Sequence, residues 1–241
     1  MFEIEAIILR ESPFKDNDMM VTALSNENIH SFLAKGVMKI DSKNKVLVTK
    51  FNKVRLELSK GKEGYNLRTG TLLNSYLHAK EGLTSLAILD FISEITNKIV
   101  SKDEASVIYP ILDKVLSLLD EGFDGLTLAL IYFAKVLTAT GYGLNVDSCQ
   151  ICHQKEAITA LSTMDGGFIC ENCFDASIHL KLNANELKIL RYIFKVDIDN
   201  FAKAALPKEE SLHVLNILEQ FALDTVDLNL KSIAFIRRII K

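Results

Sequence analysis

The sequence predicts a multi-domain α+β protein, in which an N-terminal β-barrel is followed by an α-helical domain that carries a short inserted segment. Hydrophobic residues alternate with polar ones at a period of two in much of the first 80 residues, whereas from Leu83 onward they recur at helical spacing. Four cysteines, in two close pairs, interrupt the helical part. With 49% apolar residues, the chain has ample material for a buried core.

Five segments in the first 80 residues are typical of short β-strands. They cover residues 2–10, 19–24, 29–34, 54–58 and 65–69. We expect Pro13 to end the first strand, and the second and third strands to form a hairpin across the turn residues between them. Five short strands are the number expected of a small Greek-key barrel such as the OB-fold.

Six later segments place apolar residues at helical spacing. They cover residues 83–99, 107–119, 126–138, 185–194, 212–223 and 233–240. Asn183 is a plausible N-terminal cap of the fourth helix, and Pro110 is expected to set the start of the second. Each of these helices has an apolar face that must be covered, so we expect the last three to pack on the earlier ones.

The four cysteines lie at the spacing of a structural zinc site. Cys149 and Cys152 are separated by two residues, as are Cys170 and Cys173, and seventeen residues lie between the pairs. Two such turns bring four thiolates to one ion at zinc–sulfur distances of about 2.3 Å, and they leave no open position for catalysis. The sequence therefore predicts one structural zinc ion.

Three other interpretations of the cysteines have weaker support. Free buried cysteines rarely occur by chance at this spacing, and a dithiol redox motif needs one pair beside a βαβ unit. A zinc deaminase would need a His-x-Glu element, which is absent. His153 and His179 lie beside the motif and could replace a thiolate, but we interpret them as surface or packing residues because the four sulfurs already complete a site.

The elements divide the chain into four predicted segments. They are an OB-fold domain over residues 1–80, a first helical part over residues 81–147, a zinc-binding insertion over residues 148–178, and a C-terminal helical part over residues 179–241. The two helical parts are expected to form one domain, with the cysteine segment inserted into it.

Charge is distributed unevenly along the chain. The net charge of the whole chain is -3, yet residues 35–68 contain ten basic and three acidic residues, a net charge of +7. The remaining residues therefore carry -10. This asymmetry predicts a basic, nucleic-acid-binding surface on the first domain.

Charged and aromatic side chains of the basic region can track phosphates and stack on bases. The candidate contacts are Lys35, Lys39, Lys43, Lys45, Lys53, Arg55, Arg68, Phe51 and Tyr65. The alternative is that Phe51 is a core residue and that the lysines form a solvated face. Clustered charge favours a binding face over that alternative.

We expect a cytoplasmic protein with no membrane association. The N-terminus is acidic and lacks the features of a signal peptide, and paired cysteines without export favour metal over disulfides. The longest strongly apolar run, residues 126–133, is much shorter than the roughly 20 residues that a bilayer crossing needs.

Together with the order of barrel, helices and cysteine insertion, several short motifs make the chain resemble the RecO family of bacterial recombination mediators. Residues 34–43 are similar to the family's basic Ala-Lys-Gly segment, and Gly141-Tyr142 precedes the first cysteine pair as it does there. Residues 166–170 resemble its Gly-Gly-x-x-Cys motif, and residues 230–232 its Lys-Ser element. The chain departs from the family's pattern at Gly143 and Leu144, where a proline is frequent.

The resemblance implies a nucleoid-associated protein that binds single- and double-stranded DNA, anneals complementary strands and helps to load recombinase onto strands coated by single-strand-binding protein. It implies RecR and the acidic C-terminal tail of single-strand-binding protein as partners, with the tail received by the helical domain. The phosphate contacts that it implies are Lys35, Lys39, Lys43, Arg55 and Arg68. The zinc ion then shapes only its own neighbourhood.

Two other hypotheses remain open at this point. One is a zinc-ribbon enzyme that processes nucleic acid, or its accessory subunit, for example in RNA modification. The other is a structural scaffold whose basic face binds an acidic protein. The residues carry no nucleophile and base at an interpretable spacing, and no phosphate-binding glycine-rich loop, so the enzyme hypothesis has the weaker support.

Overall fold

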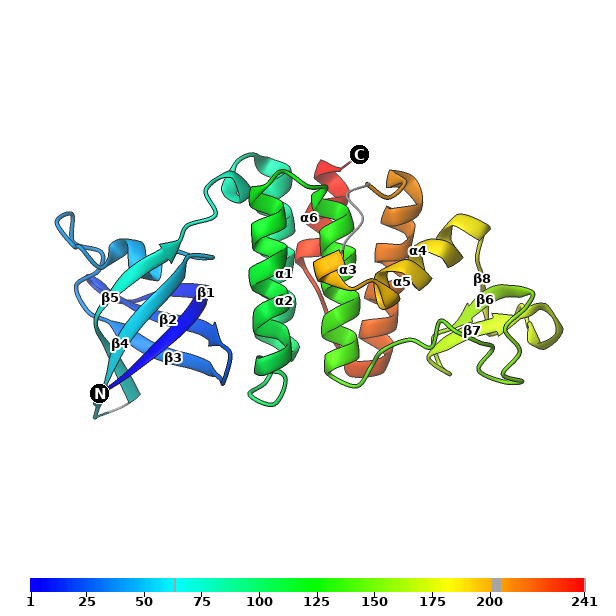
Figure 1. The fold of residues 1–241 in the computed structure, drawn as a ribbon, viewed down its shortest axis with the longest axis horizontal. Helices are drawn as coiled ribbons and strands as arrows, with labels where there is room; N and C mark the ends of the chain where they lie inside the picture. Colours follow the sequence, from blue (N-terminus) through cyan, green and yellow to red (C-terminus); the bar gives the residue numbers. More distant parts are fainter. Residues whose placement is uncertain (63, 201–204, 241) are drawn as a thin grey trace. The chain divides into compact units, whose positions relative to one another are not determined.

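A computed structural model describes residues 1–62, 64–200 and 205–240 of the chain (Figure 1). The chain divides into two compact units, neither of which is a single continuous segment. The first contains residues 1–81 and 100–122, and the second contains residues 82–99 together with residues 123–241.

The first unit contains a closed five-stranded barrel, which confirms the predicted OB-like fold. Its strands are β1 (Phe2–Lys15), β2 (Asp18–Ser25), β3 (Ile29–Ala34), β4 (Lys53–Gly61) and β5 (Gly64–Asn74). They follow the order β1-β2-β3-β5-β4, and the sheet closes by pairing β4 with β1. The pairs are antiparallel except β3 with β5, which are parallel over Phe32–Leu33 and Tyr65–Asn66. This order belongs to the Greek-key barrel that five short strands predict.

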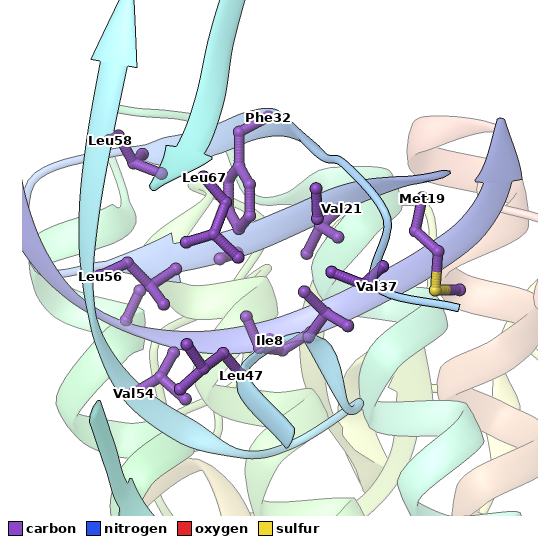
Figure 2. Close-up of a cluster of buried hydrophobic side chains, with 14 of the residues drawn as sticks. Ile8, Met19, Val21, Phe32, Val37, Leu47, Val54, Leu56, Leu58 and Leu67 are labelled. Carbon is purple, nitrogen blue, oxygen red and sulfur yellow. The ribbon is translucent and has the colours of Figure 1, made fainter. Parts of the chain in front are cut away.

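Alternate side chains of the strands fill the barrel (Figure 2). On β4, Val54, Leu56 and Leu58 are fully buried, because a period of two turns every second side chain inward. Val37 and Leu47, from the connection between β3 and β4, point into the same core. The connection is therefore anchored in the barrel at more than one point.

The expectation that Pro13 ends the first strand is wrong, because β1 continues to Lys15. Only the first part of β1, Phe2 to Ile7, pairs with β4, whereas Ala6 to Lys15 pairs with β2. Around Pro13 the strand thus has a neighbour on one side, where a missing N–H is tolerated. The register of β1 against β2 also shifts between Pro13 and Lys15.

Helix α2 (Ala105–Asp120) belongs to the same unit as the barrel. Lys53 on β4 lies 2.9 Å from Asp113 on α2 and 3.2 Å from Glu5 on β1, and the hydroxyl of Tyr109 donates to Glu5. Tyr76 donates a short hydrogen bond to Asp113. This network of charged and hydroxyl groups fixes the helix on the barrel.

Pro110 does not set the start of α2, since the helix begins five residues earlier, at Ala105. The predicted division of the chain had placed this helix in the helical domain, whereas its contacts group it with the barrel. The division of the chain into four domains or segments stays a prediction.

The second unit is mainly helical. It contains α1 (Leu83–Ile99), α3 (Gly125–Ala139), α4 (Ala184–Lys195), α5 (Lys208–Val226) and α6 (Ser232–Ile239). Helix α3 is buried over most of its length and packs against α1, α4 and α5, while α6 packs against α1. Among the described residues, no helix has both the length and the apolar character that a membrane crossing requires.

Two predicted details of this unit are confirmed. Asn183 caps α4, because its side chain accepts hydrogen bonds from the backbone N–H groups of Asn185 and Glu186. Glu186 in turn accepts from the N–H of Asn183 at 2.8 Å, which completes a capping box. The later helices also pack on the earlier ones as expected, since α1 and α3 contact α6 and α4 respectively.

Glu94 on α1 holds the start of α6. Its carboxylate accepts from the N–H of Lys231, and from the N–H of Ser232 at 2.8 Å and its hydroxyl at 2.6 Å. Burial works against the charged form, but Lys98 and these hydrogen bonds outweigh it and lower the pKa of Glu94 to about 2. Glu94 is thus the partner that anchors the predicted Lys-Ser element.

The substitution Glu94→Gln should lower the free energy of unfolding at neutral pH by about 2 kcal/mol, because the amide loses the ion pair with Lys98 and accepts fewer hydrogen bonds. The pKa of the folded carboxyl lies below its usual 4.5, so its contribution is present above that value and is lost as pH falls toward 2. Denaturant titrations at neutral and acidic pH test this. The exposed Glu121→Gln is the control, and an equal loss for Glu94→Gln at every pH would contradict the prediction.

Candidate metal centre and nucleic-acid interface

The four cysteines come together in the second unit. Their sulfur atoms all lie within 4.8 Å of one another, and the sulfurs of Cys152 and Cys170 are 3.5 Å apart. None of the four forms a disulfide. A tetrahedron with zinc–sulfur bonds of about 2.3 Å places its sulfurs about 3.8 Å apart, so one metal ion fits among them with little movement.

Two turns deliver the sulfurs. The first turn carries Cys149 and Cys152, and the N–H of His153 donates to the carbonyl of Cys149 at 2.9 Å. The second turn carries Cys170, which ends β7 (Gly167–Cys170), and Cys173, which ends the short 3-10 helix η3 (Glu171–Cys173). Strands β6 (Ile158–Ser162), β7 and β8 (Leu180–Lys181) form a small sheet in the order β7-β6-β8 that supports the second turn (Figure 1).

The paired glycines before the second turn have separate structural roles. Gly166 has a φ of +70°, which favours glycine in the tight turn between β6 and β7. At Gly167 a Cβ atom would lie 2.7 Å from the carbonyl oxygen of Asn145 and equally close to the side chain of Gln150. The missing side chain lets the segment that carries Cys149 pass close to β7.

The pKa values of two of the four thiols are shifted, in opposite directions. Burial opposes ionisation of Cys149, but backbone N–H groups of Cys152, Cys170 and Ile151 donate to its sulfur and lower the pKa of this thiol to about 6. Interaction with Cys152, followed by burial and the other two cysteines, raises the pKa of Cys173 to about 12. A divalent cation among the sulfurs would stabilise the thiolate forms of all four cysteines together.

The two nearby histidines do not join the cluster, in agreement with their interpretation from the sequence. The sulfurs form the complete metal-binding group found there among the described residues. His153 is exposed, and His179 uses its Nδ1 to accept the N–H of Asp175 at 3.0 Å. The ring of His179 packs near Phe174.

A groove of about 750 Å³ lies on the surface of the barrel. The tip of the β1–β2 hairpin, the end of β3 and the β4–β5 hairpin form its walls. Its side chains combine three lysines with two partly exposed aromatic rings, namely Lys15, Lys35, Lys62, Phe14 and Tyr65. The arrangement provides cations for phosphates and ring faces for bases.

A second hollow of about 470 Å³ extends the basic surface around Lys35. Lys39 lines this hollow, which shares Lys15, Asp18 and Lys35 with the groove. The carboxylate of Asp18 accepts the backbone N–H of Gly36 at 2.8 Å, so it is partly engaged within the protein. Two predicted contacts, Lys35 and Tyr65, therefore line the groove, and a third, Lys39, lies in its extension.

Three other predicted residues lie near one another on the barrel. Lys43 and Lys45 flank Asn44, whose side-chain amide lies 3.5 Å from the carbonyl oxygen of Arg68 on β5. All three basic side chains are exposed. They form a second basic cluster, consisting of Lys43, Lys45 and Arg68.

The remaining three predicted contacts are placed differently. Phe51 is only 3% exposed, so its ring is a core residue and has no free face for a base. Lys53 is held by Asp113 and Glu5; burial opposes its charge, but these carboxylates outweigh it and raise its pKa. Arg55 lies 3.4 Å from Glu5 and 3.7 Å from Glu3. We therefore leave Phe51 and Lys53 out of the proposed interface and treat Arg55 as largely neutralised by its neighbours.

Phe14, Lys15 and Lys62 line the groove but are not among the contacts predicted from the sequence. The pair Phe14-Lys15 directly precedes the turn residues Asp16-Asn17, and this position at a hairpin tip was the available signal. Taking Pro13 as the end of the strand hid that hairpin. Lys62 belongs to the basic region of residues 35–68 but is not one of the predicted DNA contacts.

Comparison with known proteins relates the whole chain to one family. Residues 1–76 match the family model "Recombination protein O N terminal", and residues 80–234 match "Recombination protein O C terminal". A protein of Halalkalibacterium halodurans named "DNA repair protein RecO" is 22% identical over 235 residues, which cover 96% of this chain and 92% of the relative. Proteins with that name from Bacillus cytotoxicus, 24% identical over 100% of this chain and 99% of the relative, and Listeria innocua, 23% identical over 98% and 94%, are also similar.

The barrel, the helices and the cysteine insertion appear in the chain in the order expected from the resemblance, and the two family models together cover nearly all of it. This result favours DNA repair over the RNA-modification alternative. The chain belongs to the RecO family of DNA repair proteins.

Proposed function

We propose that this protein binds single-stranded DNA in the groove of its barrel and acts as a recombination mediator. In this role it anneals complementary strands and helps to load recombinase onto DNA coated by single-strand-binding protein, without covalent chemistry. The observation that carries the proposal is the groove itself, where three lysines stand beside Phe14 and Tyr65. Such a role implies that the protein acts at the nucleoid.

The two kinds of side chain in the groove have complementary tasks. Lys15, Lys35 and Lys62 attract the phosphates in a way that does not depend on sequence. The rings of Phe14 and Tyr65 are 47% and 39% exposed, and a ring face accepts any of the four bases. Binding of this type suits a protein that must act on strands of any sequence.

The second basic cluster, Lys43, Lys45 and Arg68, supports a further contact on the same barrel. Its side chains are exposed and do not line the groove, and their positive charge suits the backbone of a duplex or of a second strand. We propose that it contributes to the binding of double-stranded DNA and to the annealing of a second strand.

A titration with salt tests the DNA-binding proposal directly. Each phosphate contact to a single strand contributes about -0.7 to the slope of log affinity against log salt, so three to five contacts predict a slope of about -2 to -3.5. Fluorescence anisotropy with an unstructured oligonucleotide measures it. An affinity that is independent of salt, or no binding at low salt, would remove the proposal, while turnover of a nucleic-acid substrate would favour a zinc-ribbon enzyme.

We also propose that Cys149, Cys152, Cys170 and Cys173 bind one zinc ion. The closeness of the four sulfurs and the preference of zinc for tetrahedral thiolate sites support this identity. When bound, the ion supplies only structure, because four protein ligands leave it no open coordination position. It stabilises the two turns and the small sheet beside them.

The acidic tail of single-strand-binding protein is a proposed partner of the helical unit. On α4, Lys188, Arg191 and Lys195 surround a shallow hollow of about 360 Å³ with Tyr192 and Val196 in its lining. Three cations around a mostly apolar surface are complementary to an acidic peptide that carries apolar side chains. RecR is proposed as a second partner on the ground of family membership, and co-elution from a sizing column tests it.

Asp147 pairs with two of the cations at the proposed peptide site. It pairs with Lys195 through a short contact and lies 3.5 Å from Arg191. Hydrogen bonding by Lys195, followed by the positive charges around it, lowers the pKa of Asp147. An incoming carboxylate must compete with this internal one.

The substitution Arg191→Glu should therefore weaken binding of an acidic, C-terminally free peptide by about tenfold, because it removes a cation and adds a repulsive charge. Asp147→Asn should strengthen it by a few-fold, because two cations are released. Calorimetric titration of each variant measures both changes, with the exposed Lys102→Glu on the other unit as control. The surface would be ruled out if Asp147→Asn and Arg191→Glu left the affinity equal to that of the control.

A further inference from the structure

The connection between β3 and β4 presents apolar side chains to solvent. The side chain of Ile40 is fully exposed, and Met38 is 45% exposed. Exposed apolar groups rimmed by charged residues are characteristic of interaction sites. Here four exposed lysines surround the two residues along the chain, namely Lys35, Lys39, Lys43 and Lys45.

The tip that carries Ile40 is pinned on both sides. Before the tip, Val37 is buried in the barrel core, and the N–H of Met38 donates to the carbonyl of Asn17 at 3.1 Å (Figure 2). After the tip, Leu47 and Val48 are buried in the same core. The loop is therefore anchored to the barrel core on both sides of Ile40, which is itself fully exposed.

Charge selects the class of partner for this loop. The four lysines are opposed in the loop only by Asp41, so the surface around Ile40 attracts a polyanion. Lys35 and Lys39 also line the hollow that extends the groove, so the loop is continuous with the proposed DNA surface. Two apolar side chains are too few for stable attachment to a bilayer, whereas a single apolar side chain suffices to separate two stacked bases.

We propose that the β3–β4 loop inserts Ile40, supported by Met38, between neighbouring bases of DNA bound to the barrel. The lysines on both sides of the loop would hold the phosphates, and the apolar tip would replace base–base stacking at one step. This inference rests on the proposed function, because it requires DNA on this surface. It adds a preference for positions where unstacking is easy, such as the junction between a single strand and a duplex.

The experiment uses the full chain and an oligonucleotide with a single-strand–duplex junction, in which 2-aminopurine replaces one base beside the junction. Fluorescence of this base rises when it is unstacked, so binding of the unsubstituted protein should raise it several-fold. Ile40→Ser should abolish most of the rise and weaken junction binding by about tenfold, with the salt slope unchanged because no charge is altered. Ile40→Phe should retain the rise.

Two further variants distinguish the insertion of Ile40 between bases from the effects of other exposed apolar residues and of the nearby lysines. Met164→Ser alters another strongly exposed apolar residue, 86% exposed and in the other unit, and should leave the fluorescence change and the affinity as they were. Lys39→Glu together with Lys43→Glu should reduce both the affinity and the salt slope, while the rise per bound protein stays unchanged.

Several outcomes would contradict the insertion of Ile40 between bases. One is binding of the unsubstituted protein without any rise in fluorescence, and another is a rise that Ile40→Ser leaves intact; either would leave DNA binding itself standing. Loss of binding to vesicles of anionic phospholipid in Ile40→Ser, with DNA binding unaffected, would assign the loop to a membrane instead. A failure of the unsubstituted protein to bind DNA at low salt would remove the proposed function as well.

Discussion

Chelation of the zinc ion that we propose at the four cysteines is expected to lower the unfolding temperature of the helical unit by about 10 °C. A ligand present at about a thousand times its dissociation constant stabilises the folded state by about 4 kcal/mol. For a unit of this size, each kcal/mol shifts the midpoint by about 2–4 °C. Thermal unfolding with and without a chelator measures the shift, and elemental analysis should find one zinc ion per chain.

The loss of stability after chelation should be local to the segment that contains the cysteines. Amide hydrogens of β6 and β7 should exchange much faster after chelation, because the two cysteine turns beside these strands lose the ion that joins them. Amide hydrogens of β4 and β5 in the barrel should keep their exchange rates. Cys149→Ser should reproduce the effect and make the protein insensitive to the chelator. Met164→Ser, a change in the turn between β6 and β7, should keep the metal. Unchanged unfolding and exchange after verified metal removal would refute a structural role.

Charge reversal in the groove should produce the largest loss of DNA affinity. Lys35→Glu combined with Lys62→Glu removes two phosphate contacts and introduces repulsion, so single-strand affinity at low salt should fall by about 100-fold. The salt slope should flatten by about 1.4, which corresponds to two contacts. Anisotropy across a salt series gives both quantities.

A ring substitution separates stacking from charge in the same groove. Tyr65→Ala should weaken binding by about tenfold without changing the salt slope, because it removes a stacking surface and no cation. Phe2 packs edge-on against Tyr65 at a centroid distance of 5.0 Å, so thermal unfolding of the variant must be measured alongside. Lys102→Glu is the charge control. Equal losses for Lys102→Glu and the double groove variant would show that only net charge matters, and would exclude a specific groove.

Local pattern was sufficient to predict the barrel strands, the helices and the clustering of the four cysteines. The alternation at Val54, Leu56 and Leu58 needs only a buried face on one strand, and all five predicted barrel strands are present. The cysteine spacing is equally local, because two tight turns define it. The capping box at Asn183 and Glu186 also lies within four residues.

The candidate DNA contacts that the structure does not support, Lys53 and Phe51, depend on tertiary contacts that the local sequence does not show. Lys53 looks like any other lysine of the basic region, yet Asp113, sixty residues later, neutralises it. The charged neighbours of Phe51 favour a stacking role, whereas the fold buries its ring in the core. Whether a charged residue is free to bind a ligand depends on such distant partners, and periodicity contains no information about them.

The discontinuous build of the first unit limits how the protein can be dissected. The polypeptide leaves the barrel after residue 81 and returns at residue 100 to supply helix α2. A fragment cut at residue 80 would strip Lys53 and Tyr76 of Asp113, and would leave both polar groups facing water or an unfilled interior. A longer fragment that ends at residue 122 would include α1 without the helices α3 and α6 that cover it. Loss of DNA binding in either truncation would report damaged packing and not the location of the binding surface, so point substitutions in the intact polypeptide are the cleaner tool.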